Sequence, residues 1–413
     1  MNNAETGVVI IGGGAAGIAA GRRLLDLHIE CLILEARPRL GGRSWTVTAP
    51  LGPLDLGCGW LHSADRNPWR QIAETEGFSI DRTPPPWSRP YLPIGFPLDE
   101  QKRFRKALQQ FRQRMDDFPD GEPDVAASTL LEANGRWNDL IASATSRVSG
   151  TEPDRLSVRD ITRYADSGVN WRVAEGYGSL IARFGAPVPT ALECPVTRID
   201  HRGRRLVIET AKGTLTADSA IVAVPSRSLA EERIRFDPPL PQKAEAAAGL
   251  PLGLADKLFL ALDQAEEFEK DSRLFGPTNH CATAAYNVRP FGRPMIEAYF
   301  GGRHAAELET GGQAAFVDFA LSELAGILGG DIKRRLKPLA FHGWASDPFA
   351  GGSYSFALPG QTECRAALAQ AVDSRLFFAG EACSTHDYST AHGAYLTGVD
   401  AADQAAAIFA RKT

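Results

Sequence analysis

Three glycines near the N-terminus have the spacing that lets a peptide backbone bind the phosphates of a dinucleotide. Gly12, Gly14 and Gly17 follow the apolar run at residues 8–11 and precede a stretch of small residues. This order predicts a strand, a tight turn and a helix start, in which Gly12 permits the turn, Gly14 lets the backbone approach a pyrophosphate, and Gly17 lets the helix pack on the strand. The N-terminus of that helix offers free N–H groups to the anion.

An acidic residue and a second glycine turn strengthen this interpretation. A second apolar run, residues 31–34, ends at Glu35, where a parallel strand would present a carboxylate to the ribose hydroxyls and disfavour a 2′-phosphate. The turn at residues 40–43 supplies Gly42 and Arg43, whose guanidinium can neutralise a pyrophosphate, and Arg37 is another candidate. The glycine pattern alone is weak, because 40 glycines in the chain produce chance matches. The two features beside it make a bound dinucleotide the better reading.

Further segments, in the same order along nearly the whole chain, make it resemble the flavin-containing amine oxidases, a family that includes monoamine, polyamine and spermine oxidases and the lysine-specific histone demethylases. These segments lie at residues 55–69, 174–184, 194–200, 220–225, 254–262, 344–360 and 375–402. The resemblance implies FAD as the cofactor.

The resemblance also assigns cofactor contacts to particular residues. Val196 matches a valine whose backbone meets adenine, and Gly380 with Glu381 matches a segment near the ribityl chain and pyrophosphate, although an acid at a helix start is the plainer reading of Glu381. The amides of Ala394 and Tyr395, at the start of an expected C-terminal helix, would face the flavin N1 and C2=O. The residues Ala15, Ala16 and Ala36 complete the expected cofactor set.

Four positions are expected to carry the chemistry. Local sequence alone favours Lys257 as a lysine at a strand edge that faces water. The resemblance implies instead that Lys257 holds a water molecule against flavin N5. Burial at that place would lower the pKa of the lysine. Tyr354 and Tyr395 match two rings that flank the substrate amine, although ordinary packing is the alternative. His62 matches a histidine near the substrate, with a structural role as the alternative and Asp65 as a second contact.

One departure bears on how the cofactor is held. Monoamine oxidases have a cysteine bonded covalently to the flavin before the first ring position, and this chain has Ser353 there. We therefore expect noncovalent FAD. The implied reaction transfers a hydride from the carbon bearing the amine nitrogen to flavin N5; the imine is hydrolysed to an aldehyde or ketone, and O2 reoxidises the flavin to give hydrogen peroxide. No protein metal or nucleophile is needed.

The motifs lie at both ends of the chain and in its middle, which predicts interleaved domains. We expect a Rossmann-type α/β FAD-binding domain with three layers and a parallel sheet, built from residues 1–66, 170–238 and 345–413. Residues 67–169 and 239–344 would form a substrate-binding domain with a mixed sheet and helices. Helical patterns with Phe104, Leu108, Phe111 and Met115 on one face, and across residues 314–328, support this. We expect the Lys and Arg residues on the other face of the first of these helices to face solvent.

Composition limits the remaining classes. With 413 residues, 44% hydrophobic and 23% charged, the chain is typical of a globular protein of two domains, and a net charge of −5 gives no basic face for nucleic acid. No apolar run approaches the roughly 20 residues of a membrane span. The six cysteines lack metal-ligand spacing, and no signal-peptide pattern begins the chain, which favours a cytoplasmic location.

Several alternatives stay open. Desaturases and protoporphyrinogen oxidases share the glycine motifs, although Lys257, Tyr354 and Tyr395 argue against this activity. Two further alternatives are an interaction protein that holds a flavin and a protein that keeps the fold without binding a flavin. The sequence does not choose among monoamines, polyamines and amino acids, nor between O2 and another acceptor, nor between a monomer and a homodimer. An amino acid would call for an arginine clamp, and the sequence does not say whether Arg89, Arg163, Arg172 or another arginine provides one.

Overall fold

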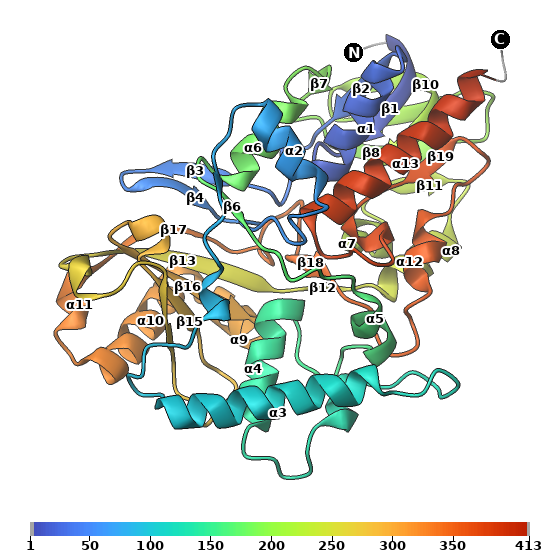
Figure 1. The fold of residues 1–413 in the computed structure, drawn as a ribbon. Helices are drawn as coiled ribbons and strands as arrows, with labels where there is room; N and C mark the ends of the chain where they lie inside the picture. The colour runs from blue at the N-terminus through green and yellow to red at the C-terminus, as the bar shows by residue number, and fades with distance from the viewer. Residues whose placement is uncertain (1–3, 411–413) are drawn as a thin grey trace.

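The computed structural model describes residues 4–410 and contains two large sheets, each with its own helices (Figure 1). The first sheet has eight strands in the order β11-β8-β9-β10-β1-β2-β7, with β19 also paired to β10. Its strands are β1 (Ala4–Ile11), β2 (Cys31–Leu34), β7 (Thr190–Ala191), β8 (Val196–Asp200), β9 (Leu206–Thr210), β10 (Gly213–Val222), β11 (Arg235–Asp237) and β19 (Leu376–Phe378).

The centre of this sheet is parallel and covered on both faces. Val8 and Ile10 of β1 belong to one core cluster and Val9 and Ile11 to another, so successive residues are buried on opposite faces. The first cluster packs against α1 (Ala15–Asp26), α2 (Pro68–Thr75), α6 (Tyr177–Gly185) and α13 (Ala391–Ala410). The second packs against α7 (Ser226–Ala230), α8 (Pro241–Ala248) and α12 (Cys364–Ala369). This three-layer α/β arrangement is the predicted one, except that β9 runs antiparallel to both neighbours because short turns connect them.

The second sheet has the order β14-β15-β16-β13-β17 and is antiparallel throughout, whereas a mixed sheet was expected. Its strands are β13 (Ala255–Leu262), β14 (Ser272–Phe275), β15 (Ala285–Val288), β16 (Met295–Gly301) and β17 (Leu336–His342). The helices α9 (Gly302–Glu309), α10 (Gly312–Leu328) and α11 (Ile332–Arg335) follow β16. Leu258 and Leu260 face Phe316 of α10, so the alternate residues Lys257 and Phe259 lie on the other face.

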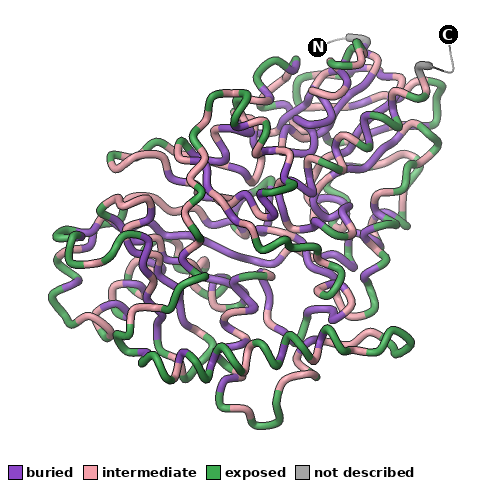
Figure 2. Tube along the Cα trace, in the orientation of Figure 1, coloured by how far each residue is buried: buried purple, intermediate pink, exposed green. Residues whose placement is uncertain are grey.

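A helical layer closes the side of the molecule opposite the first sheet. It comprises α3 (Leu98–Asp116), α4 (Asn138–Ser149) and α5 (Val158–Arg163). Phe104, Phe111 and Met115 of α3 are buried in one cluster with Phe275 of β14, as the helical pattern predicts. Figure 2 shows α3 along the margin of the molecule, with exposed residues on its outer side.

Short elements connect these layers. Three small two-stranded antiparallel sheets are formed by β3 (Thr46–Ala49) with β4 (Gly52–Asp55), β5 (Ile80–Asp81) with β6 (Arg172–Val173), and β12 (Leu252–Gly253) with β18 (Tyr354–Ser355), of which the first is a hairpin. Five 3-10 turns are η1 (Pro86–Ser88), η2 (Ala127–Leu130), η3 (Ala265–Glu267), η4 (Pro290–Gly292) and η5 (Glu381–Cys383). Within residues 4–410, no helix is both long and apolar enough to cross a membrane. The expected domain boundaries stay a prediction.

Candidate active site

One cavity of about 1180 Å³ extends from the glycine turn after β1 to the free face of the second sheet. It exceeds the roughly 300–1,000 Å³ of ordinary small-molecule pockets, as a cofactor and substrate together would require. Of the residues predicted for the cofactor and the substrate, Gly17, Asp65 and Tyr395 do not line it. The residues that do are Gly12, Gly14, Ala15, Ala16, Glu35, Ala36, Arg37, Gly42, Arg43, His62, Val196, Lys257, Tyr354, Gly380, Glu381 and Ala394.

The glycine turn has the close packing that its sequence predicts. Gly12 has a φ of +102°, and a Cβ there would lie 2.5 Å from the carbonyl oxygen of Ala223. A Cβ at Gly17 would lie 1.9 Å from the carbonyl oxygen of Gly12, so this residue serves helix packing rather than the cavity. At Gly14 the nearest atom would be 3.9 Å away, which leaves the backbone open toward the cavity. The residues present therefore fit a pyrophosphate.

Glu35 stands at the end of β2, as expected, and is held by the same turn. Its carboxylate accepts hydrogen bonds from the amide of Gly13 at 2.6 Å and of Arg37 at 2.8 Å, and its remaining lone pairs can accept ribose hydroxyls. The Arg37 guanidinium lies 2.8 Å from Asp347 and is buried, not exposed. The Arg37 side chain is 10% exposed and that of Arg43 is 23% exposed, so Arg43 is the more accessible candidate for the pyrophosphate.

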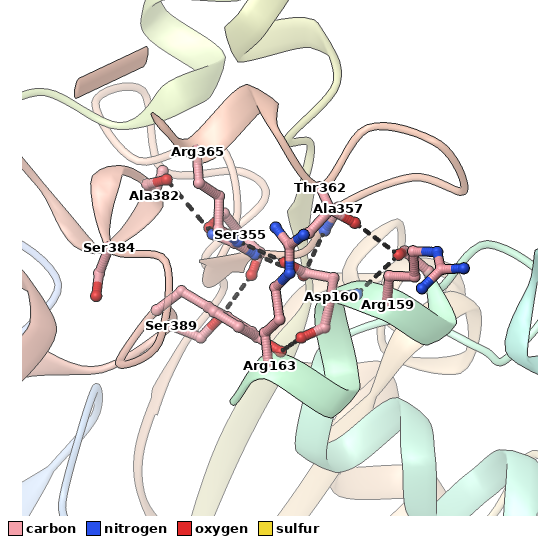
Figure 3. Close-up of polar contacts among 12 residues, drawn as sticks. Arg159, Asp160, Arg163, Ser355, Ala357, Thr362, Arg365, Ala382, Ser384 and Ser389 are labelled. Carbon is pink, nitrogen blue, oxygen red and sulfur yellow. Dashed lines mark hydrogen bonds and ion pairs between the residues drawn. The ribbon is translucent and has the colours of Figure 1, made fainter. Parts of the chain in front are cut away.

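Arg43 and Glu381 join the cofactor half of the cavity to a buried polar network. The Arg43 Nη1 lies 2.8 Å from Glu381, which also accepts from the Ser355 hydroxyl at 2.6 Å. Ser355 accepts in turn from Arg365, whose guanidinium pairs with Asp160 at 2.7 Å and, like Asp160, is fully buried (Figure 3). Burial alone would raise the pKa of Glu381, but Arg43, Ser355 and Arg365 lower it below its usual value. Glu381 is therefore ionised at neutral pH.

Lys257 lies in the interior of the second sheet, between β16 and β17, so the strand-edge reading is wrong. Its side chain is buried, and Nζ donates to the carbonyl oxygen of Asp55 at 3.0 Å and lies 3.3 Å from Glu297. Burial lowers its pKa, as the sequence predicts, but the charges of Glu297 and Asp55 outweigh burial and raise the pKa overall. The lowered pKa expected for a buried lysine is therefore wrong, because that expectation considered burial without these two carboxylates.

The structure does not bring Tyr354 and Tyr395 together. The Tyr354 hydroxyl donates to the carbonyl oxygen of Arg147 at 2.8 Å and lies 3.3 Å from the Tyr299 hydroxyl. The Tyr395 ring instead packs edge-on against Trp69, with centroids 5.2 Å apart, outside the cavity. The aromatic slot predicted for this pair is therefore not formed by these two residues.

The last helix begins earlier than expected. Helix α13 begins at Ala391, four residues before Tyr395, and the hydroxyl of Thr390 accepts the amide of Gly393 at 2.9 Å in the manner of an N-cap. The amide of Ala394 already donates to the carbonyl of Thr390 at 3.1 Å. The amides of Ala394 and Tyr395 thus belong to the helix ladder, and the free N-terminal amides lie earlier, beside Thr390.

His62 lines the cavity and is held in place from one side. Its Nδ1 lies 2.6 Å from the Asn170 side-chain oxygen, and burial lowers its pKa, so the ring is neutral at neutral pH. Asp65 is exposed, bonds to Ser167 and does not line the cavity, so it is not a second substrate contact here.

Two of the three candidate clamp arginines are engaged elsewhere. Arg163 pairs with Glu363, and Arg172 pairs with Asp81 and Asp271, and neither lines the cavity. Arg89 does line it.

Sequence reasoning missed Glu297, Tyr299, Arg147 and Arg273, which also line the cavity. Glu297 and Tyr299 alternate with the apolar residues of β16 and therefore share one face of the sheet, a period-two signal that the sequence contains. Tyr299 lies directly opposite Lys257 in the sheet register. No local pattern marks Arg147 or Arg273, because their place depends on how α4 and β14 pack.

Comparison with known proteins agrees with this architecture. The family model described as flavin containing amine oxidoreductase matches residues 15–166 and 158–406. Polyamine oxidase 5 of Oryza sativa subsp. japonica is 27% identical, over 98% of this chain and 88% of that protein, and Polyamine oxidase 4 of the same organism is 29% identical, over 96% and 88%. A solved structure of putrescine oxidase bound to putrescine superposes with a TM-score of 0.78 at 19% identity, over 99% of this chain and 100% of that chain, a likeness of fold. The chain therefore belongs to the flavin containing amine oxidoreductases and is a flavin-dependent oxidoreductase that acts on amines.

Proposed function

We propose that the protein is an amine oxidase that uses noncovalent FAD and O2. The observation that carries the proposal is one continuous cavity, which has the glycine turn and Glu35 at one end and Lys257 and Tyr354 at the other. A cofactor whose phosphates lie at Gly14 would have room to extend toward the second sheet. The substrate amine would then bind between the cofactor and that sheet.

Ser353 supports noncovalent attachment. Its hydroxyl donates to the carbonyl oxygen of Ala255 at 2.9 Å and accepts the amide of the same residue at 2.8 Å. It is thus tied to β13, and a serine offers no thiol for a bond to the flavin. Arg43 would pair with the pyrophosphate, and Glu381 orients Arg43 through their ion pair.

The bound flavin would accept a hydride equivalent from the carbon that bears the amine nitrogen and pass its electrons to O2, which yields hydrogen peroxide. The protein supplies position and electrostatics. Lys257, kept charged by Glu297, can hold a water molecule and stabilise negative charge that forms beside it. Neutral His62 can accept a hydrogen bond from the substrate amine, since Asn170 fixes the ring through Nδ1. Water then hydrolyses the imine product to a carbonyl compound and releases the nitrogen.

Anaerobic titration of the purified protein with monoamines, polyamines and amino acids tests the proposal. Bleaching of the oxidised flavin band by one class, followed by return of the colour and formation of peroxide when air is admitted, is the expected result. Bleaching that persists in air would replace O2 with another acceptor. Failure of every amine to bleach the flavin would contradict the proposal and favour desaturase-type chemistry.

A further inference from the structure

The part of the cavity remote from the glycine turn is rich in arginine. Five of its lining residues are Arg89, Arg105, Arg112, Arg147 and Arg273. The whole cavity has four acidic lining residues, which are Glu35, Asp166, Glu297 and Glu381. Glu35 and Glu381 belong to the cofactor half, and Glu297 pairs with Lys257. A polyamine would therefore meet mainly like charge in this part of the cavity.

Arg147 is a buried cation without a carboxylate partner. It lies on α4 and is only 6% exposed, and its Nη1 donates to the Ser143 hydroxyl at 2.6 Å and to the carbonyl oxygen of Thr283 at 3.1 Å. Its guanidinium stacks on the Phe275 ring at 4.6 Å. Within residues 4–410 it forms no ion pair. Burial, with a smaller contribution from Arg273, lowers its pKa to about 10, so a bound anion would relieve an existing cost.

Arg273 lies beside it with an unsatisfied donor. Its buried Nε has no hydrogen-bond partner, its guanidinium stacks on the Tyr91 ring at 4.5 Å, and in the described part of the chain it too forms no ion pair. Both arginines line the cavity, they lie near enough for the charge of Arg273 to lower the pKa of Arg147, and both retain free N–H groups. A planar carboxylate accepts such paired N–H groups in a bidentate manner.

The sheet register fixes how far this wall lies from the proposed reaction site. Arg273 lies opposite Asn287, and Asn287 lies opposite Glu297, the partner of Lys257. With about 4.8 Å between neighbouring strands, β14 lies on the order of 14 Å from the strand of Lys257. Tyr354 connects the two regions, because its hydroxyl donates to the backbone of Arg147. An anion at the arginines would thus be separated from the reacting amine carbon by several atoms.

The approach to the cavity has the same sign of charge. Arg105 and Arg112 are seven residues apart on α3, so they lie on one face of the helix, and both line the cavity while remaining exposed. Among the described residues, neither pairs with a carboxylate. Both residues are exposed, as expected of a solvated helix face, and because they also border the cavity they can attract an anionic ligand toward the opening.

We propose that the substrate is an amine with a carboxylate at the end remote from the oxidised carbon, and that Arg147 and Arg273 bind this carboxylate. The inference rests on the proposed amine oxidation and narrows its substrate class to amino carboxylates of several carbons, in place of polyamines.

The test uses the holoenzyme and three ligands of equal length: 6-aminohexanoate, hexylamine and 1,6-diaminohexane, followed by the four- and eight-carbon series. In anaerobic titration, the amino carboxylate is expected to half-saturate flavin bleaching at a concentration at least ten-fold below hexylamine, with the diamine weakest. The variant Arg273→Met removes the charge and keeps the apolar stem. It should raise the half-saturating concentration of the amino carboxylate at least ten-fold and leave that of hexylamine unchanged.

Arg289→Met is the matched control, since Arg289 also has a buried, unpaired Nε but does not line the cavity. This variant should change neither the half-saturating concentration of the amino carboxylate nor that of the simple amine. If the diamine bleaches best and Arg273→Met does not alter the preference, the inference is overturned while amine oxidation stands.

A calorimetric titration of the holoenzyme with pentanoate separates the two proposals. Binding by the wild type that is lost in Arg273→Met supports the arginine site even if no amine bleaches the flavin, a result that would contradict only the proposed function. Absence of pentanoate binding to the wild type would overturn the arginine site.

Discussion

Lys257 and Glu297 form an ion pair inside the cavity, with Nζ 3.3 Å from the carboxylate oxygen. They lie on adjacent antiparallel strands, β13 and β16, where Glu297 is two residues from Tyr299, the direct partner of Lys257. Side chains of both strands at these positions share one sheet face, so the carboxylate reaches the ammonium group diagonally. Burial lowers the pKa of the lysine, and Glu297 is the largest of the charges that oppose burial and raise this pKa.

We therefore expect Glu297→Gln to lower the pKa of Lys257. The folded pKa of the wild-type lysine is raised, so its charge persists until the pH rises above its ordinary value of about 10.4. In the variant the charge is lost at lower pH, and the alkaline decline of flavin reoxidation by O2 should begin at least one pH unit earlier, as stopped-flow measurements would show. Glu307→Gln, on the exposed surface of α9, is the control. An unchanged pH profile in Glu297→Gln would contradict the role of the pair.

The two tyrosines predicted to act together should respond differently to loss of their hydroxyl groups. Tyr354→Phe removes the hydrogen bonds to Arg147 and Tyr299, and we expect kcat/KM for the best amine to fall about ten-fold and the free energy of unfolding to fall by about 1 to 2 kcal/mol. Tyr395→Phe retains the ring packing on Trp69 and should change kcat/KM less than two-fold. A comparable loss of activity in both variants would contradict this account and support the predicted aromatic slot.

The sequence predicts those parts of the molecule that are encoded over a short stretch. The strand at residues 31–34 and the helix across residues 314–328 are found within two residues of the predicted bounds, because periodic apolar residues and a glycine turn specify them locally. The face of β13 that carries Lys257 follows from the same alternation.

Features that depend on long-range packing were not predictable. Tyr395 was assigned to the cavity by its resemblance to a ring position of the family, whereas the helix begins four residues earlier than expected and directs this side chain toward Trp69. The charged residues on the outer face of α3 have the same spacing in the sequence whether they face bulk water or border a cavity, so the sequence does not distinguish the two. Arg365 and Asp160 are 205 residues apart, and no local pattern pairs them.

The ion pair of Arg365 and Asp160 gives a prediction about stability. Both side chains have no exposed surface, and the guanidinium donates to the two carboxylate oxygens at 2.7 and 2.8 Å. Asp160→Asn would leave a buried guanidinium uncompensated, and we expect the free energy of unfolding to fall by about 3 to 5 kcal/mol, measured by urea titration. Asp99→Asn, which breaks the exposed pair with Arg103, should cost less than about 0.5 kcal/mol. Equal effects of the two variants would contradict this account.

Glu381 should couple flavin retention to pH. Its carboxylate positions Arg43 and also accepts the Ser355 hydroxyl, so Glu381→Gln is expected to weaken FAD binding about ten-fold at pH 7, as release measured by flavin fluorescence would show. Glu363→Gln is the control, since Glu363 is an exposed glutamate that pairs with Arg163 on the surface.

The sign of the pH effect follows from the lowered pKa of Glu381. A carboxylate whose folded pKa lies below its unfolded value of about 4.3 stabilises the protein above that pH, and this contribution is lost as the pH falls through the folded pKa. The difference in unfolding midpoint between the wild type and Glu381→Gln should therefore be largest near pH 7 and shrink below about pH 4.3. A difference that stays constant down to pH 3 would mean that Glu381 contributes through packing rather than through its charge, and that Arg43 is held by other contacts.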